Sequence, residues 1–317
     1  MRLAREKLLG GGCYYHLMNR VAGDKHWYPF RDVDKEYGMN LIRRLSSYYL
    51  LEIISMCWMG NHYHIVLYEP QTHELPDDKE IVKRHNNFYG EDKLSKHIQL
   101  NDKEQLKKVR KNMTDISHFM KIFQQQITNY INRKYDRRGT LWADRFKSTI
   151  LERRNALWQV VEYIELNPLR ARLTESTSDY RHCTWGWYKG SGKHIFHNNF
   201  IKHMKGALGS VADNWSDLAL FNLFESELVR ITLSEKGIAG KELFEMVQEA
   251  KKGETMPVKF LRRTRHWTDG GIIGSKAFVQ KIACQFRDAK KVMKKQFSHG
   301  KTNDGTSIYC YKMLRNT

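Results

Sequence analysis

The chain has 317 residues, of which 41% are hydrophobic, so it can bury the core of one large domain or two smaller ones. Its 54 Lys and Arg residues outnumber its 35 Asp and Glu residues and give a formal net charge of +19. With 12% aromatic residues, this charge favours a nucleic-acid partner over an acidic protein or a small metabolite. Cations neutralise phosphates, and aromatic rings stack on unpaired bases. A basic solvated surface is the alternative.

The five cysteines are scattered and form no Cys-x-x-Cys pair, which argues against a zinc ribbon and against a secreted disulfide framework. We therefore expect reduced thiols. No long uncharged apolar run occurs, and three glycines at 10–12 interrupt the N-terminal apolar stretch, so we expect neither a membrane span nor a signal peptide. The expected location is the cytoplasm, in association with the nucleoid, with no membrane partner.

The first third of the chain alternates strand and helix patterns. Residues 13–20 form a predicted strand, residues 34–49 a helix, and residues 53–68 two strands joined by the turn residues Gly60 and Asn61. This order is the first half of a ferredoxin-like split βαβ sheet. Residues 70–112 are polar and rich in breakers, and we expect an insertion or a mobile loop region there.

The pattern then completes the same motif. Apolar residues recur at three- and four-residue steps from Asp115 to Ile131 and predict a second helix, and residues 142–151 predict the closing strand. The expected fold class is α+β, with a ferredoxin-like antiparallel sheet and helices on one of its faces. A third helix is expected from Asn155, as N-cap, to residue 167, before Pro168.

A change in composition at 189–193 suggests a boundary between two domains, 1–190 and 195–317. The second is expected to be mainly helical and is a candidate accessory DNA-binding unit, because basic residues cluster in it. A helical cap with a solvated basic face is the alternative. The segments concerned are the predicted helices 215–224, 241–251 and 275–297, with Ser275 as an N-cap, and the basic runs 262–267 and 290–295.

Two polar patterns suggest chemistry. His62 and His64 flank Tyr63 on a predicted strand, so both imidazoles point to the same face and can hold one metal ion between them. Two histidines on a solvated strand face are the alternative. In the third predicted helix, Gln159, Tyr163 and Asn167 are spaced by four residues and form a polar stripe at the edge of the apolar face.

These features, together with three linked motifs, resemble the HUH single-tyrosine DNA-processing enzymes and, more closely, the REP-associated tyrosine transposases. The motifs are Gly-Thr-Leu-Trp at 139–142, Arg-Phe-Lys-Ser at 145–148 and Val-Glu-Tyr-Ile-Glu-Leu-Asn-Pro-Leu-Arg at 161–170. The resemblance covers about residues 10–188. It implies a transposase-like enzyme that acts in transposition and cleaves single-stranded DNA, and it leaves open whether the enzyme only cuts or also rejoins the strand.

The resemblance also implies roles for individual residues. His62 and His64 would bind a divalent cation, Mg²⁺ or Mn²⁺, and Asn167 would supply a further ligand or polar contact. Two imidazole ligands favour Mn²⁺ over Mg²⁺, which prefers oxygen. Tyr163 would attack the phosphorus, forming a 5′-phosphotyrosine link and leaving a free 3′-hydroxyl. For Asn167 a helix C-cap beside Pro168 is the alternative.

The implied partner is single-stranded DNA carrying hairpins of repeated extragenic palindromes, bound by a monomer, with a dimer as the alternative. Trp142 and Phe146 stack on bases or belong to the core. The cations expected to hold the DNA backbone flank the tyrosine motif in sequence: Arg133, Lys134, Arg137, Arg138, Arg145 and Lys147.

Two other hypotheses stay open at this stage. One is a non-catalytic nucleic-acid-binding protein that keeps the fold and the basic surface without activity. The other is a structural zinc site that uses His62 and His64, although no cysteines lie at a matching spacing.

Overall fold

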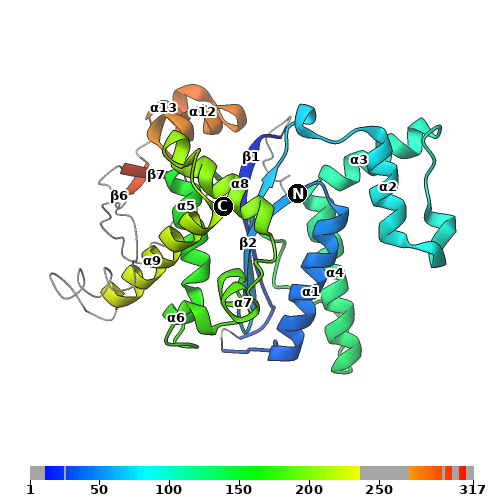
Figure 1. Ribbon diagram of the computed structural model, residues 1–317, viewed down its shortest axis with the longest axis horizontal. Coiled ribbons are helices and arrows are strands. Elements are labelled where there is room, and N and C mark those ends of the chain that lie inside the picture. The colour runs from blue at the N-terminus through cyan, green and yellow to red at the C-terminus, as the bar shows by residue number, and fades with distance from the viewer. Residues whose placement is uncertain (1–10, 25, 236–270, 295–296, 302–306, 312–317) are drawn as a thin grey trace.

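The computed structural model describes residues 11–24, 26–235, 271–294, 297–301 and 307–311. In this part of the chain seven strands form one sheet in the order β2-β3-β1-β4-β5-β7-β6 (Figure 1). The strands are β1 (Cys13–Arg20), β2 (Glu52–Trp58), β3 (His62–Glu69), β4 (Lys147–Leu151), β5 (Ile272–Gly274), β6 (Ser298–Lys301) and β7 (Ser307–Tyr311).

The first four strands confirm the predicted fold class. β1 pairs antiparallel with both β3 and β4, and β3 pairs antiparallel with β2, which is the strand order of a ferredoxin-like sheet. Odd-numbered residues of β1, such as Tyr15 and Leu17, face one side, where they pack against α1 (Asp32–Tyr48) and α4 (Ile116–Lys134). These two helices carry the apolar stripes that the sequence pattern predicts.

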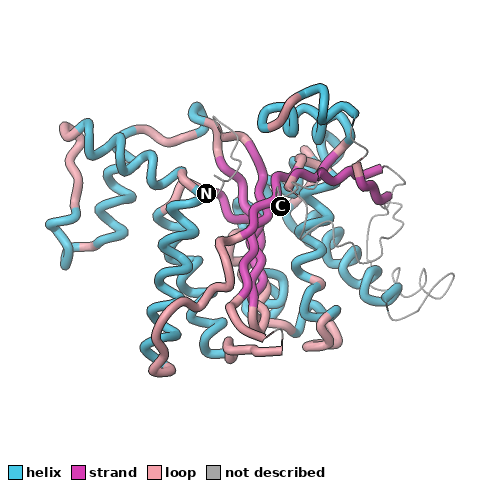
Figure 2. Tube along the Cα trace, turned by 180° about the vertical axis from the view of Figure 1, so that it is seen from behind, coloured by secondary structure: helices cyan, strands magenta, loops and turns pink. Residues whose placement is uncertain are grey.

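Helices cover the opposite face of the sheet as well, whereas the sequence analysis predicted helices on one face only. Even-numbered residues of β1 and β3, such as Tyr14 and Val66, pack into a second core. Its helices are α5 (Asn155–Glu165), α7 (Thr184–Ser191), α8 (His197–Leu208) and α9 (Asp217–Glu235). Figure 2 shows the strands between the two layers of helices. The reason is that residues after 155 supply enough apolar surface for a whole second layer.

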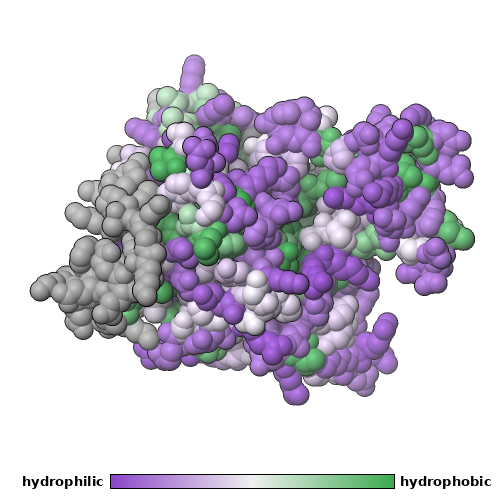
Figure 3. All heavy atoms as spheres, in the orientation of Figure 1, coloured by the Kyte–Doolittle hydropathy of each residue, from purple (hydrophilic) through white to green (hydrophobic). Residues whose placement is uncertain are grey.

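Residues 70–112 form ordered helices where the sequence suggested a loop region. α2 (Asp78–Tyr89) and α3 (Lys103–Thr114) begin at the N-caps Asp77 and Asp102, whose carboxylates accept hydrogen bonds from the third helical residue. Few of their side chains are buried, among them Ile81 and Leu106, so the apolar signal in the sequence is weak. The pair projects from the side of the molecule, and hydrophilic side chains cover most of it (Figure 3).

The region after residue 195 continues the same sheet. β5 pairs in parallel with β4, and β7 and β6 follow antiparallel, a three-strand extension that the mainly helical prediction missed. The predicted helix over 275–297 appears as α12 (Lys276–Phe286), capped by Ser275, and α13 (Ala289–Lys294). The predicted helix 241–251 and the basic run 262–267 lie outside the described residues.

Two boundaries near the tyrosine motif differ from the prediction. β4 begins only at Lys147, because the preceding segment makes a single bridge, Trp142 to Val21, rather than a ladder. The N-cap of α5 is Arg154 and not Asn155. Phe146 is buried and the Trp142 ring packs against Phe30 and Tyr63, so the core role of these two aromatics is the one the structure supports.

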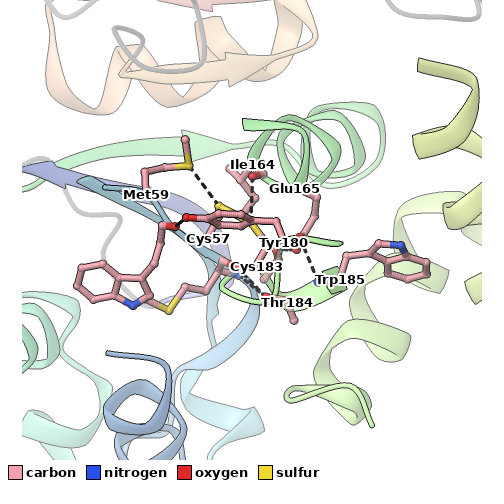
Figure 4. Close-up of a disulfide and its surroundings, with 11 residues drawn as sticks. Cys57, Met59, Ile164, Glu165, Tyr180, Cys183, Thr184 and Trp185 are labelled. Carbon is pink, nitrogen blue, oxygen red and sulfur yellow. Dashed lines mark hydrogen bonds between the residues drawn. A yellow bond between two sulfur atoms is a disulfide. The ribbon is translucent and has the colours of Figure 1, made fainter. Parts of the chain in front are cut away.

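One pair of cysteines corrects the expectation of reduced thiols. Cys57 on β2 and Cys183, just before α7, form a disulfide across a sequence separation of 126 residues (Figure 4). The fold brings together two cysteines that share no sequence motif, which is why spacing could not predict the bond. Among the described residues Cys13 and Cys284 are free thiols.

Among the described helices, none is long and apolar enough to cross a membrane. α6 (Asn167–Arg170) follows α5 directly after Leu166, the C-cap of α5, and completes the elements around the site.

Candidate active site

The histidine pair lies at the end of the sheet where β3 begins. His62 and His64 point to the face that α5 covers, because the intervening Tyr63 belongs to the opposite core. Their ring centroids are 5.1 Å apart. His62 Nδ1 lies 2.8 Å from Asn61 Oδ1, and since a carbonyl oxygen only accepts, Nδ1 is the donor. The lone pair of His62 is therefore on Nε2.

A third histidine adjoins the pair. His16, on β1, is buried, and its Nε2 lies 2.9 Å from Nδ1 of His64, with the ring centroids 5.1 Å apart and the ring planes inclined by 20°. In the β1–β3 ladder Met18 is opposite His64 and Arg20 is opposite His62, so Arg20 shares the face of the imidazoles. The face therefore carries three imidazoles and one guanidinium within two adjacent strands.

Burial keeps the two predicted ligands neutral. It lowers the pKa of His62 to about 4, with the positive charge of Arg20 as the second cause. It also holds the pKa of His64 well below its ordinary value, helped by the neighbouring His16 and His62. A neutral imidazole offers a lone pair to a cation, so these environments suit metal ligands at pH 7.

Tyr163 comes to the same place from the covering layer. The centroid of its ring is 5.8 Å from that of His64 and 6.3 Å from that of His16, edge-on in both cases. The side chain is half-buried, and the guanidinium carbon of Arg170 lies 5.6 Å from the ring centroid. The helix thus places a phenol beside the imidazoles of two strands, with a cation over its ring.

The rest of the polar stripe flanks Tyr163 along the helix. Asn167 lies one turn further on, as the first residue of α6 rather than as the C-cap of α5. Its Nδ2 is buried without a hydrogen-bond partner among the described residues, as is Oε1 of Gln159, one turn before Tyr163. A buried polar atom left without a partner is costly, so Nδ2 of Asn167, a donor, suits an acceptor such as a phosphate oxygen, and Oε1 of Gln159 suits a donor or a cation.

These side chains fit a divalent cation. Two imidazole nitrogens and one amide occupy at most three coordination positions and leave others for water and a phosphate oxygen, as a catalytic site requires. Within the described ranges no group of three or more His, Cys, Asp or Glu side chains is arranged to hold a metal ion. A closed structural zinc site made of such residues is therefore not formed by the described part of the chain.

Most of the cations predicted to bind DNA gather at this end of the sheet. Lys147 is opposite Met18, in the same row of the sheet as His64. The segment before it is tied to the end of β1, since Ala143 N–H donates to the carbonyl of Arg20 at 3.0 Å. Three more of the predicted cations are exposed. Arg133 lies at the end of α4, Arg138 in the turn after it, and Arg145 just before β4.

Two of the predicted cations, Lys134 and Arg137, contact side chains of the protein itself. Lys134 Nζ donates to Asp34 at 2.5 Å, and this carboxylate is fully buried. The guanidinium of Arg137 lies 4.9 Å from the ring centroid of Trp27. Their charges therefore stabilise the end of α4 through these contacts. Their predicted role in DNA binding stays a prediction.

Sequence reasoning missed His16 and Arg20 as site residues. Both lie at even positions of the first predicted strand, so the period of two already placed them on one face. What the sequence lacked was the register between β1 and β3, which brings this face beside His62 and His64.

No family model matches the chain, and no curated protein matches it. Among solved structures it is similar to a REP-associated tyrosine transposase bound to a REP hairpin, with 14% identity and a TM-score of 0.39. That match covers 61% of this chain and 87% of the other.

Proposed function

We propose that this protein is a metal-dependent single-stranded DNA transesterase of the transposase type. The observation that carries the proposal is the position of the Tyr163 ring, 5.8 Å from His64 between centroids, from an element 99 residues later in the chain. A nucleophile beside a pair of neutral imidazoles that can hold a cation is one arrangement that supports phosphodiester cleavage through a covalent intermediate.

In the proposed reaction the Tyr163 oxygen attacks the phosphorus of a DNA phosphodiester. The bond from this oxygen to phosphorus forms and the bond from phosphorus to the 3′-oxygen breaks. The proton that the phenol loses goes, directly or through water, to the departing 3′-oxygen. A divalent cation bound by His62 and His64, with Asn167 as a further ligand, would polarise a phosphate oxygen when present. Rejoining reverses the exchange without ATP, because the phosphotyrosine link keeps the energy of the phosphodiester.

The chain's own cations have separate tasks. Arg20 lies on the face of the imidazoles and Arg170 over the tyrosine ring, so both can neutralise the phosphate at the site of attack. The exposed Arg133, Arg138 and Arg145 would hold the DNA backbone on either side. The proposed partner is single-stranded DNA that carries a hairpin.

The proposed acting form is a monomer. Tyr163 and the imidazoles of the same chain already lie together, so a second copy is not needed to complete the site. Size-exclusion chromatography with light scattering during turnover tests this: cleavage by a species of twice the 37.6 kDa chain mass alone would contradict it.

The experiment for the proposed activity uses a labelled hairpin-bearing single strand with Mn²⁺ or Mg²⁺ and looks for a covalent adduct on denaturing gels. The adduct should be absent in Tyr163→Phe and retained in Tyr188→Phe, a matched change at a half-buried tyrosine of α7. His62→Ala should bind the DNA and fail to cleave it. Binding without any adduct in the wild type would instead favour the non-catalytic nucleic-acid-binding protein.

A further inference from the structure

The contact between His16 and His64 determines which nitrogen of His64 is available. Both rings are buried, and the 2.9 Å separation of His16 Nε2 and His64 Nδ1 requires one proton between them. If His64 donates, its Nε2 keeps the lone pair. If His16 donates, the single ring proton of neutral His64 is on Nε2, and no lone pair is left to bind a cation.

We propose that His16 is a positioning residue that accepts the Nδ1 proton of His64 and thereby keeps the Nε2 lone pair of His64 available for a divalent cation. The inference rests on the proposed function, because it assigns His16 to the cation site of that function. Nε2 lies across the imidazole ring from Nδ1, so it points away from His16.

The imidazole of His62, the other proposed ligand, is also held by an acceptor at its Nδ1. Asn61 Oδ1 accepts from Nδ1 of His62 at 2.8 Å, which leaves Nε2 of His62 as the free acceptor. With His16 as acceptor, each of the two imidazoles is fixed through Nδ1 and offers Nε2. Ligand histidines in metal sites commonly donate their second nitrogen to a fixed acceptor, and loss of that acceptor typically weakens metal binding 10- to 100-fold.

His16 is placed to do this without binding the cation itself. In this contact its Nε2 is occupied by His64, and the two ring planes are inclined by only 20°, which suits a hydrogen bond between ring edges. It is also rigidly held, because β1 is a central strand that pairs on both sides. A side chain on a central strand keeps its angle and distance better than one on a loop.

The first test reads the tautomers directly in the metal-free, full-length protein. Two-bond ¹H–¹⁵N correlation spectra of histidine-labelled protein distinguish Nδ1–H from Nε2–H rings. We expect His64 as the Nδ1–H tautomer in the wild type and in His16→Gln, whose amide oxygen can replace Nε2 as acceptor. In His16→Phe the Nε2–H form should gain population. A wild-type His64 protonated on Nε2 would overturn the proposal.

The second test measures Mn²⁺ affinity by calorimetry and counts coordinated imidazoles by pulsed electron paramagnetic resonance. His16→Phe should bind Mn²⁺ 10- to 100-fold more weakly and still show two imidazoles at saturation, and His16→Gln should recover most of the affinity. A matched control is His85→Phe, at a buried histidine of α2, which should leave Mn²⁺ affinity unchanged.

The outcomes separate this inference from the proposed function. Loss of one coordinated imidazole in His16→Phe would make His16 a ligand and overturn the positioning role, as would unchanged Mn²⁺ affinity. Tyr163→Phe should keep wild-type Mn²⁺ affinity while abolishing the adduct. A wild type that holds the Nδ1–H tautomer and binds Mn²⁺, yet forms no adduct, would sustain the role of His16 and refute the transesterase.

Discussion

The buried carboxyl of Glu165 should make folding stability depend on pH in a predictable way. This residue ends α5, is buried, and accepts a hydrogen bond from Ser55 Oγ at 2.6 Å. It also accepts one from the Trp185 backbone N–H at 3.1 Å (Figure 4). Burial raises the pKa of Glu165 to about 7, and the hydrogen bonds only partly oppose this. Because α5 carries Tyr163, the same contacts fix the tyrosine helix on the sheet.

The sign and size of this pH dependence follow from the number of protons that the folded and unfolded states bind. Between the ordinary glutamate pKa of 4.5 and the folded value of about 7, the folded protein holds the proton and the unfolded chain releases it. Stability therefore falls as pH rises through this window. At 1.36 kcal/mol for each pH unit, the loss attributed to Glu165 is about 3 kcal/mol, complete just above pH 7.

Glu165→Gln isolates this contribution, because the amide cannot ionise. We expect the free energy of unfolding of the wild type, relative to that of the variant, to fall by about 3 kcal/mol between pH 4.5 and pH 7.5. Urea titrations at four pH values, followed by tryptophan fluorescence, measure the difference in free energy of unfolding between the wild type and the variant. The contributions of the other titrating groups are the same in both proteins and cancel. Glu104→Gln, at an exposed position of α3, controls for the loss of one negative charge. Parallel pH curves for the wild type and Glu165→Gln would refute the reasoning.

Three further substitutions test the fold. Replacing Cys57 and Cys183 together with Ala opens a loop of 126 residues and should lower the free energy of unfolding by up to about 5 kcal/mol, measured in urea without reductant. Gly38→Ala should cost about 2 kcal/mol in the same assay, because a Cβ there would overlap the buried indole of Trp58. Lys134→Ala removes a cation from the fully buried aspartate of α1 and should cost about 2 kcal/mol, measured by thermal unfolding.

The four-strand core could be predicted from the sequence because its signals are local. Apolar strands, the Gly60-Asn61 turn and the helical period around them need no knowledge of distant contacts. α2 and α3 escaped prediction because they are polar helices with few buried side chains. β5 has three residues, Ile272–Gly274, and no periodic pattern can be recognised in so short a strand.

The candidate site likewise contains residues that local sequence patterns predicted and residues that only the tertiary structure revealed. His62 and His64 could be placed on one face from a two-residue spacing, and Tyr163 on a polar stripe from a four-residue spacing. The contribution of His16 depends on the register of β1 against β3, and the Cys57–Cys183 bond depends on packing across 126 residues. Such contacts are set by the tertiary structure. The local spacing of residues does not reveal which distant segments pair or in which register.

The site is assembled from two layers, so its geometry depends on how α5 lies on the sheet. The imidazoles belong to β1 and β3, and the phenol belongs to α5, which Glu165 joins to β2 and α7. A change at Glu165 leaves the two imidazole ligands on β3 in place, and we expect it to shift Tyr163 and the adjoining Asn167 relative to His64. Glu165→Gln should therefore keep most of the Mn²⁺ affinity, which His62 and His64 supply, while slowing single-turnover formation of the DNA adduct, since small displacements of a reacting atom are costly. Equal losses in Mn²⁺ affinity and adduct rate would instead mean that the two layers do not move independently.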